Sequence, residues 1–278
     1  MPNALHDQLA SYIANEIRDN APRLLVGLCG SQGSGKSTLA ASVKQLLKAR
    51  KIHTVVLSID DLYLTRKERT NLSESVHPLL QTRGVPGTHD VTLGLEVLNA
   101  LTCSGRRPLP CFDKARDDRR PLSHWPVVRT PARVVIFEGW CIGAIPENDA
   151  ALIEPVNELE RNEDSQGTWR RYVNQALAGD YQRLFAMIDR LIMLKAPSFD
   201  VVYGWRLEQE QRLLNQALAE GADPALIMND EQVRRFISFY ERLTLHMLHE
   251  MPSRADAVIE LDSSRRPLAV RFKEKTAG

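Results

Sequence analysis

Apolar and polar positions follow two patterns along the chain, and each pattern predicts a different secondary structure. Five short runs are almost continuously apolar and end in glycine or polar residues, at residues 24–30, 53–63, 133–140, 189–197 and 257–262. Runs of this kind are typical of strands that are buried on both faces of a parallel sheet. The sequence therefore predicts five buried strands.

Helical spacing of apolar residues appears between these strands. Near the N-terminus, Leu5, Leu9 and Ile13 lie four residues apart and predict an amphipathic helix that ends near residue 20. The same pattern predicts further helices at residues 34–50, 92–101, 168–188, 199–221 and 230–249. Strands that alternate with helices favour an α/β fold. We therefore predict a five-stranded parallel sheet with helices on both faces.

Residues 64–131 differ from the rest of the chain, because they are rich in Pro, Gly, Arg and Asp. Long irregular segments inside a compact domain are usually functional or disordered. Charged residues are mixed here with aromatics and prolines, so we expect an ordered substrate-binding excursion between the second and third strands. The acidic residues 146–167 predict a surface segment instead. The basic tail after residue 262 predicts a frayed end.

Composition and charge exclude several classes of protein. The chain has 278 residues, of which 43% are hydrophobic, and its 36 Lys and Arg nearly balance its 35 Asp and Glu. A net charge of +1 gives no overall attraction to nucleic acid or membranes, so electrostatic recognition must be local. Its four cysteines form no CxxC pair and no zinc spacing, which favours incidental thiols in a reducing compartment. We find no secretory signal and no membrane-spanning stretch, and expect a cytoplasmic protein.

The clearest motif is GSQGSGKS at residues 30–37, which fits the pattern G-x-x-x-x-G-K-[ST] at every required position. Its glycines let the backbone curl around phosphate oxygens, and its N–H groups form an anion-binding nest at a helix N-terminus. Lys36 would reach the β- and γ-phosphates, and the Ser37 hydroxyl would bind Mg²⁺. We therefore predict that ATP and Mg²⁺ bind here, through Gly30, Ser31, Gln32, Gly33, Ser34, Gly35, Lys36, Ser37 and Thr38.

Carboxylates follow two of the predicted strands. Asp60 and Asp61 end the second strand, and Glu138 closes the third. Ligands of an open parallel sheet lie at the carboxyl ends of its strands, so all three should point toward the phosphate loop. We assign Glu138 to the metal together with Ser37, and Asp60 to the role of catalytic base. Asp61 is the alternative base, or a turn residue.

A helix after the fourth strand could act as a lid, within residues 197–220. It carries Arg206 in the setting YGWRL, and Arg212 six residues further on. An arginine that reaches over the nucleotide neutralises charge on the transferring phosphoryl group. Arg206 is the better candidate for this catalytic role, alongside Lys36. Arg212 fits equally well with an exposed pair to Glu208.

Taken together, the phosphate loop, SIDDLY, RGVPGTHD, PCFDKARDDR, VIFEGW and YGWRLEQEQ resemble the D-glycerate 3-kinase family. That family belongs to a wider group with uridine kinases, phosphoribulokinases and bacterial pantothenate kinases. The resemblance covers residues 23–262, and RGVPGTHD and FDKARDDR are its specific elements. It implies one P-loop NTPase/kinase domain over residues 1–278, with Asp60 as base and a lid helix that carries Arg206. Phe112 stands where relatives often have tyrosine, so a hydroxyl contact to substrate is not expected there.

The resemblance also implies which residues contact the acceptor. By position, the substrate-binding set is Asp61, Arg83, His89, Asp90, Lys114 and Arg116. The residues themselves agree with an anionic acceptor, since a carboxylate calls for Arg or Lys and the excursion supplies several, Arg119 included. For Arg119 and Arg120, pairs with Asp117 and Asp118 on the surface are the alternative.

The predicted function is ATP-dependent phosphorylation of a small anionic metabolite, with D-glycerate as the leading acceptor and 3-phosphoglycerate as product. A kinase of the same group with another acceptor, such as uridine, pantothenate or a sugar phosphate, is the first alternative. A regulatory P-loop NTPase is less favoured, because the fourth strand ends in LKAPSFD and not in a guanine-reading NKxD motif. We expect no nucleic-acid, membrane or obligate protein partner.

Overall fold

A single mixed sheet forms the centre of the computed structural model, which describes residues 3–220 and 228–273. Its six strands lie in the order β10-β9-β8-β1-β7-β2. Five of them run parallel, as predicted: β1 (Leu24–Gly30), β2 (Thr54–Ser58), β7 (Val134–Gly139), β8 (Arg190–Lys195) and β9 (Ala257–Leu261). The prediction of five strands was one short, because β10 (Pro267–Phe272) adds an antiparallel edge.

The basic tail was expected to fray, and this expectation is wrong for residues 267–272. Val270 and Phe272 alternate along β10 and pack against the core, and the Phe272 ring lies 4.6 Å from that of Tyr12. Two inward apolar side chains in six residues are enough to order an edge strand beside β9. Because this alternation is short and lies among arginines, the sequence pattern did not indicate a strand.

Nine helices are resolved in the described residues. They are α1 (Asn3–Asn15), α2 (Lys36–Ala49), α3 (Arg66–Ser75), α4 (Val91–Ala100), α5 (Glu158–Glu163), α6 (Thr168–Ala176), α7 (Gln182–Phe185), α8 (Asp200–Glu220) and α9 (Asp230–Arg254). Each predicted helix is present, although residue 221 of the predicted lid helix lies outside the described residues. None of the described helices has the length and apolar character that crossing a membrane requires.

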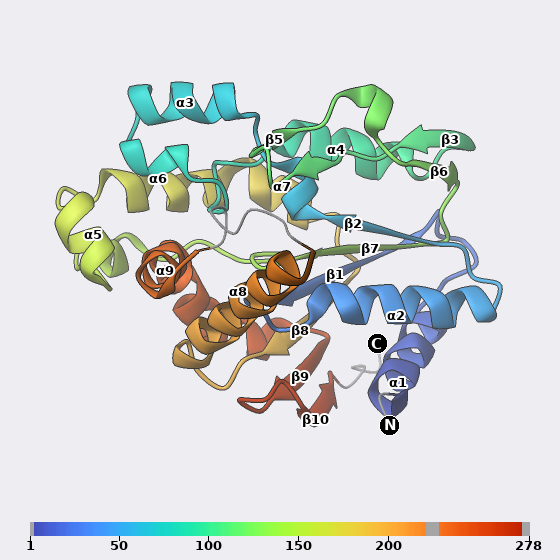
Figure 1. Ribbon diagram of the computed structural model, residues 1–278. Helices are drawn as coiled ribbons and strands as arrows, with labels where there is room; N and C mark the ends of the chain where they lie inside the picture. Colours follow the sequence, from blue (N-terminus) through green and yellow to red (C-terminus); the bar gives the residue numbers. More distant parts are fainter. Residues whose placement is uncertain (1–2, 221–227, 274–278) are drawn as a thin grey trace.

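The strands are buried on both faces, as continuous apolar runs predict. Along β1, Val26 and Leu28 pack into one cluster with α1, α2 and α8, whereas Leu25 packs into a second cluster with α4 and α7. Side chains alternate between the faces of a strand, so a strand covered on both faces is apolar throughout. Figure 1 shows α1 and α2 below the sheet and α4 and α7 above it.

The excursion of residues 64–131 is ordered, as expected. Two antiparallel pairs form in it, β3 (Gly105–Pro108) with β6 (Val127–Thr130) and β4 (Phe112–Asp113) with β5 (Asp118–Arg119). The guanidinium of Arg69 is fully buried and donates to the carbonyl oxygens of Leu64, Gln81 and Asp117. One arginine therefore ties together three parts of an otherwise irregular segment.

Helix α3 was not predicted, although the sequence carries a signal for it. Thr65 and Glu68 form a reciprocal capping box, in which each side chain accepts from the backbone N–H of the other residue. This T-x-x-E pattern marks a helix start even where the helix itself is polar. Helical spacing of apolar residues could not find it, since α3 reads RKERTNLSES.

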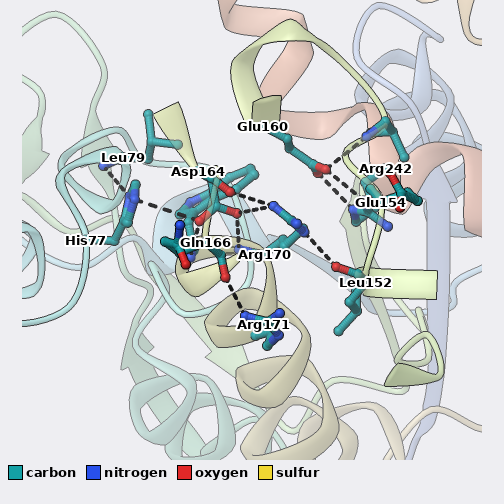
Figure 2. A network of polar contacts seen from close by, with 12 residues as sticks. His77, Leu79, Leu152, Glu154, Glu160, Asp164, Gln166, Arg170, Arg171 and Arg242 are labelled. Atoms are coloured by element: carbon teal, nitrogen blue, oxygen red, sulfur yellow. Dashed lines mark hydrogen bonds and ion pairs between the residues drawn. The ribbon is translucent and has the colours of Figure 1, made fainter. Parts of the chain in front are cut away.

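Residues 146–167 were expected to form a surface segment, and two of their carboxylates are in fact buried. Glu160 accepts from Arg242 of α9 at 2.8 and 2.7 Å, and Asp164 accepts from Arg170 at 3.0 Å. Figure 2 shows these pairs and the carbonyl groups that satisfy the remaining guanidinium donors. Buried charges are tolerated when they are paired and hydrogen-bonded in this way.

The same network reaches the excursion through His77. Its Nε2 lies 3.8 Å from Asp164 Oδ1, and its Nδ1 accepts from the backbone N–H of Leu79 (Figure 2). Three segments that are distant in sequence therefore meet at one polar cluster: the excursion, the segment with α5 and α6, and α9.

We expect the Glu160–Arg242 pair to be critical for stability. Glu160→Ala leaves the Arg242 guanidinium buried with half of its partners missing, and breaking such a pair costs about 3–5 kcal/mol. Urea denaturation followed by circular dichroism measures the loss. Glu163→Ala is the control on the same helix, because it removes an exposed pair with Arg235 and should barely move the midpoint. Equal effects of the two variants would contradict this account.

Candidate active site

The phosphate loop lies between β1 and α2, where the sequence placed it. Gly33 and Gly35 adopt φ values of 74° and 88°, in the left-handed region that favours glycine. Gly35 caps α2 without a side-chain hydrogen bond, so the first N–H groups of that helix face the loop. A Cβ on Gly33 would lie 2.8 Å from Cβ of Trp205, so this position also needs glycine for packing.

A candidate Mg²⁺ position lies beside the loop. The Ser37 hydroxyl donates to Glu138 Oε1 at 2.8 Å, while Glu138 Oε2 is buried and has no hydrogen-bond partner among the described residues. A hydroxyl and a carboxylate with a free oxygen are suitable ligands for Mg²⁺, directly or through water. The described residues hold no cluster of three or more His, Cys, Asp or Glu that would bind a metal alone. A metal here would therefore depend on the phosphates of the nucleotide.

Asp60 lies directly after β2, in a short turn of 3₁₀ helix (Ile59–Leu62). Its Oδ2 accepts from Lys114 Nζ at 2.6 Å, and its Oδ1 accepts from the Tyr63 hydroxyl at 2.8 Å. Burial raises the pKa of this carboxyl, but the charges of Lys114 and Lys36 outweigh burial and hold the pKa well below its ordinary value. Asp60 is therefore ionised and faces the loop lysine.

Asp61 has a different environment from its neighbour. Its Oδ1 accepts from the backbone N–H of Phe112 at 3.1 Å, which anchors β4 to the end of β2. Burial raises its pKa, against the effect of that hydrogen bond. Asp60 lines the main cavity, whereas Asp61 is not among the lining residues that the structure describes. This geometry favours Asp60 over Asp61 as the base.

One cavity of about 790 Å³ connects these groups. It contains the phosphate loop and runs from Asp60 and Lys114 on one side to the β9–β10 turn on the other. The strand order explains the span, because β2 and β9 lie on opposite sides of β1. The start of α1 closes the far side, where His6 Nδ1 lies 2.8 Å from the Ser42 hydroxyl of α2.

Arg206 of α8 lines the cavity, as expected of a lid arginine. Its guanidinium is paired with the buried Glu210 and lies 4.9 Å from the ring centroid of Phe236. Its Nε is buried without a partner among the described residues. Arg212 also lines the cavity, but it is exposed and lies 3.6 Å from Glu208, as its surface alternative predicted.

No family model matches the chain, but individual relatives do. It is 34% identical over 243 residues to the uncharacterized kinase mug58 of Schizosaccharomyces pombe, covering 84% of each chain. It is 31% identical over 270 residues to the chloroplastic D-glycerate 3-kinase of Arabidopsis thaliana, covering 90% of this chain and 55% of the plant protein. The solved D-glycerate 3-kinase of Cryptococcus neoformans superposes with a TM-score of 0.78 at 27% identity, over 97% and 99% of the two chains.

The chain belongs to the D-glycerate 3-kinase family. The predicted P-loop kinase fold and the prediction of a phosphotransferase are thereby confirmed. Four of the six motifs on which the resemblance rested contribute residues to the cavity wall: the phosphate loop, SIDDLY at the end of β2, PCFDKARDDR at the β4–β5 turn and YGWRLEQEQ in α8.

Two basic residues of the predicted substrate-binding set contact Asp60 or the aromatic side chains beside it. Lys114 contacts the Asp60 carboxylate directly. Arg83 is paired with Asp117, and its guanidinium lies 5.5 Å from the ring centroid of Phe112 and 6.0 Å from that of Tyr63. Lys114 therefore pairs with Asp60 itself, whereas Arg83 lies over Tyr63, whose hydroxyl donates to Asp60.

His89 lies behind Tyr63 and is only 5% exposed. The two rings stack with centroids 4.7 Å apart, and His89 Nδ1 lies 2.6 Å from the Tyr181 hydroxyl. Burial lowers the pKa of His89 to about 4, so the ring is neutral. Its Nε2 is buried without a partner in the described part of the chain.

Asp90 and Arg116 have contacts that do not need a ligand. Asp90 caps α4 by accepting from Leu93 N at 2.9 Å, and its other oxygen accepts from Arg119 at 3.1 Å. Arg116 is exposed, and its backbone N–H donates to Asp113. Their predicted substrate contacts stay predictions.

The expected surface pairs of Arg119 and Arg120 with Asp117 and Asp118 do not form. Arg119 pairs with Asp90, and Arg120 lies 3.4 Å from Asp113. The antiparallel β4–β5 pairing sets Asp113 opposite Asp118.

Sequence reasoning missed two residues of the site. Tyr63 lies within SIDDLY, and its hydroxyl donates to Asp60. Arg265 was left within the basic tail, and its Nε donates to the Gly33 carbonyl at 2.8 Å. The strand end offered a signal for Tyr63, three residues after Asp60. Nothing local identifies Arg265, because its partner lies 232 residues away.

Removing the Lys114 charge should make the activity of this kinase sensitive to acid. In Lys114→Ala, burial of Asp60 is no longer offset by its nearest cation, so the Asp60 pKa rises. Asp60 then takes up a proton as the pH falls, and the acid limb of the kcat/KM profile moves to higher pH. Lys48→Ala, at an exposed position in the last turn of α2, is the control for loss of one positive charge. An unshifted acid limb would argue against Asp60 as the base.

Proposed function

We propose that the protein transfers the γ-phosphoryl group of ATP to D-glycerate and forms 3-phosphoglycerate. The observation that carries this proposal is the position of Asp60. An ionised carboxylate shares one cavity with the phosphate-loop lysine and is paired with Lys114 of the excursion, while Arg83 lies over Tyr63, whose hydroxyl donates to that carboxylate. The D-glycerate 3-kinases among its relatives support the choice of acceptor.

ATP would bind along the cavity with its phosphates in the loop. Lys36 and the N-terminus of α2 offset the charge of the β- and γ-phosphates. Mg²⁺ would be held by Ser37 and Glu138 with the phosphate oxygens, and it supplies charge neutralisation when bound. The nucleoside would extend toward Leu261 and Pro267, away from Asp60.

The acceptor would bind at the Asp60 end through its carboxylate. Arg83 and Lys114 are the cations within reach, and both are already paired with carboxylates of the chain. A substrate carboxylate that draws Lys114 away from Asp60 removes the main cause of its low pKa. Binding would then raise the basicity of Asp60 just where it must accept the hydroxyl proton.

Arg206 would complete the site from the lid. Its guanidinium is paired with Glu210, so contact with the γ-phosphate requires exchange of that carboxylate for a phosphate oxygen. Closure of a lid over the cavity would exclude water and favour transfer to the acceptor over hydrolysis. The cytoplasmic location and the lack of nucleic-acid, membrane or obligate protein partners stay predictions from the sequence.

Acceptor-dependent release of ADP is the direct test. D-Glycerate should stimulate ADP release by the purified protein, and Asp60→Asn should lower kcat by about 10²–10⁴-fold, as expected for loss of a general base. ATP binding, measured by calorimetry, should be kept. Asp61→Asn is the matched control: it loosens β4 and should cost stability more than kcat.

Stimulation by uridine or pantothenate, with no response to glycerate, would overturn the acceptor while leaving a kinase. Stimulation by a protein partner alone, with no response to any small acceptor, would favour a regulatory NTPase.

The metal assignment has its own test. Glu138→Gln keeps the shape of the side chain and the hydrogen bond from Ser37 but removes the charge. We expect the Mg²⁺ concentration for half-maximal activity to rise about 10–100-fold, the range found when groups that support a metal are changed. Titration of activity with Mg²⁺ at fixed ATP measures it. An unchanged Mg²⁺ requirement would exclude Glu138 from the metal site.

A further inference from the structure

The turn between β9 and β10 has a rigid geometry that places one arginine. Asp262 closes the turn, since its Oδ1 accepts from the backbone N–H groups of Ser264 and Arg266 at 2.8 Å each. Arg265 adopts a φ of 65°, in the left-handed region that residues with a side chain seldom occupy. Glycine or asparagine would suit this backbone better, so the arginine side chain must have contacts that favour it here.

Those contacts join two parts of the active site. Arg265 Nε donates to the carbonyl oxygen of Gly33 in the phosphate loop at 2.8 Å. Its second terminal nitrogen donates to Glu208 of α8 at 2.7 Å, and the guanidinium lies 5.5 Å from the ring centroid of Trp205. One side chain therefore bonds the loop and the lid helix at the same time.

The junction around this arginine is closely packed. Trp205 is 2% exposed, and its indole N–H donates to the Ser263 carbonyl at 2.6 Å. Gly33 leaves no room for even a methyl group against Trp205. Closely packed interfaces have low compressibility and transmit displacement. A shift of the loop must therefore move α8 or break these bonds.

We propose that Arg265 is a positioning residue that couples the phosphate loop to the lid helix. Through it, binding of nucleotide at the loop sets the position of α8, and with it Arg206, which follows Trp205 directly. Arg265 acts through Gly33, Trp205 and Glu208. The inference needs nucleotide binding at the loop, but it holds for any acceptor.

The test compares Arg265→Ala with Arg271→Ala under the same conditions. Arg271 lies on the same hairpin and pairs with Glu260 on the surface, so its variant makes the same chemical change outside the junction. The probe is the β,γ-imido analogue of ATP with Mg²⁺. Its Kd is measured by calorimetry, and hydrogen exchange of the α8 amides is measured with and without saturating analogue.

In the wild type and in Arg271→Ala, the analogue should slow exchange in α8. In Arg265→Ala, the Kd should rise about tenfold or more, as expected for loss of a hydrogen bond to a charged donor. Saturating analogue should then protect the loop but no longer protect α8. Arg265→Lys keeps the charge but lacks the paired N–H donors of the guanidinium. Its Kd and its protection of α8 should lie between those of the wild type and Arg265→Ala.

Glu208→Gln distinguishes the contact of Arg265 with α8 from its contact with the phosphate loop. It weakens the bond to α8 and leaves the bond to Gly33, so protection of α8 should fall while the Kd stays near that of the wild type. Retained protection of α8 in Arg265→Ala would overturn the proposal. So would a uniform loss of protection and thermal stability with the response to analogue intact, because Arg265 would then be merely structural. None of these readouts uses an acceptor, so failure of the glycerate assignment would not affect them.

Discussion

The parallel pairing of β1 with β7 is the constraint on which the active site depends. The register sets Leu28 of β1 beside Glu138 of β7, so the phosphate loop begins two residues beyond the level of Glu138, the proposed metal ligand. β2 pairs with the other edge of β7 and sets Ser58 beside the same glutamate. Parallel strands end at one edge, so the phosphate loop, Glu138 and Asp60 converge there.

Several charged side chains around this edge are paired with each other in the absence of ligand. Asp60 is paired with Lys114, Arg83 with Asp117, and Arg206 with Glu210. Under the proposed function, each pair would exchange one partner for a charged group of the substrates. The near-neutral net charge of the chain therefore does not indicate these cations, because carboxylates of the protein itself are paired with them.

What the sequence revealed depended on how far apart the interacting residues lie. The phosphate loop, Asp60 and Glu138 were predictable, because spacing within one loop and the rule for strand ends are local. Glu160 and Asp164 were assigned to the surface, since a pattern of acids cannot show the arginines that bury them. The contact of Arg265 could not be predicted for the same reason. Helix α3 is different, because its capping box is a local signal from which it could have been predicted.

The motif VIFEGW connects the phosphate loop with the excursion. Glu138 faces Ser37, and two residues later the Trp140 indole N–H donates to the Gly84 carbonyl at 2.8 Å. Gly84 has a φ of 134°, and a Cβ there would lie 2.1 Å from the Tyr240 hydroxyl of α9, so no other residue lets Trp140 and α9 meet at this point. Arg83 precedes Gly84, and its position is thereby fixed from the strand that holds the metal ligand. The proposed metal ligand Glu138 and the proposed substrate residue Arg83 are thus both tied to one strand end.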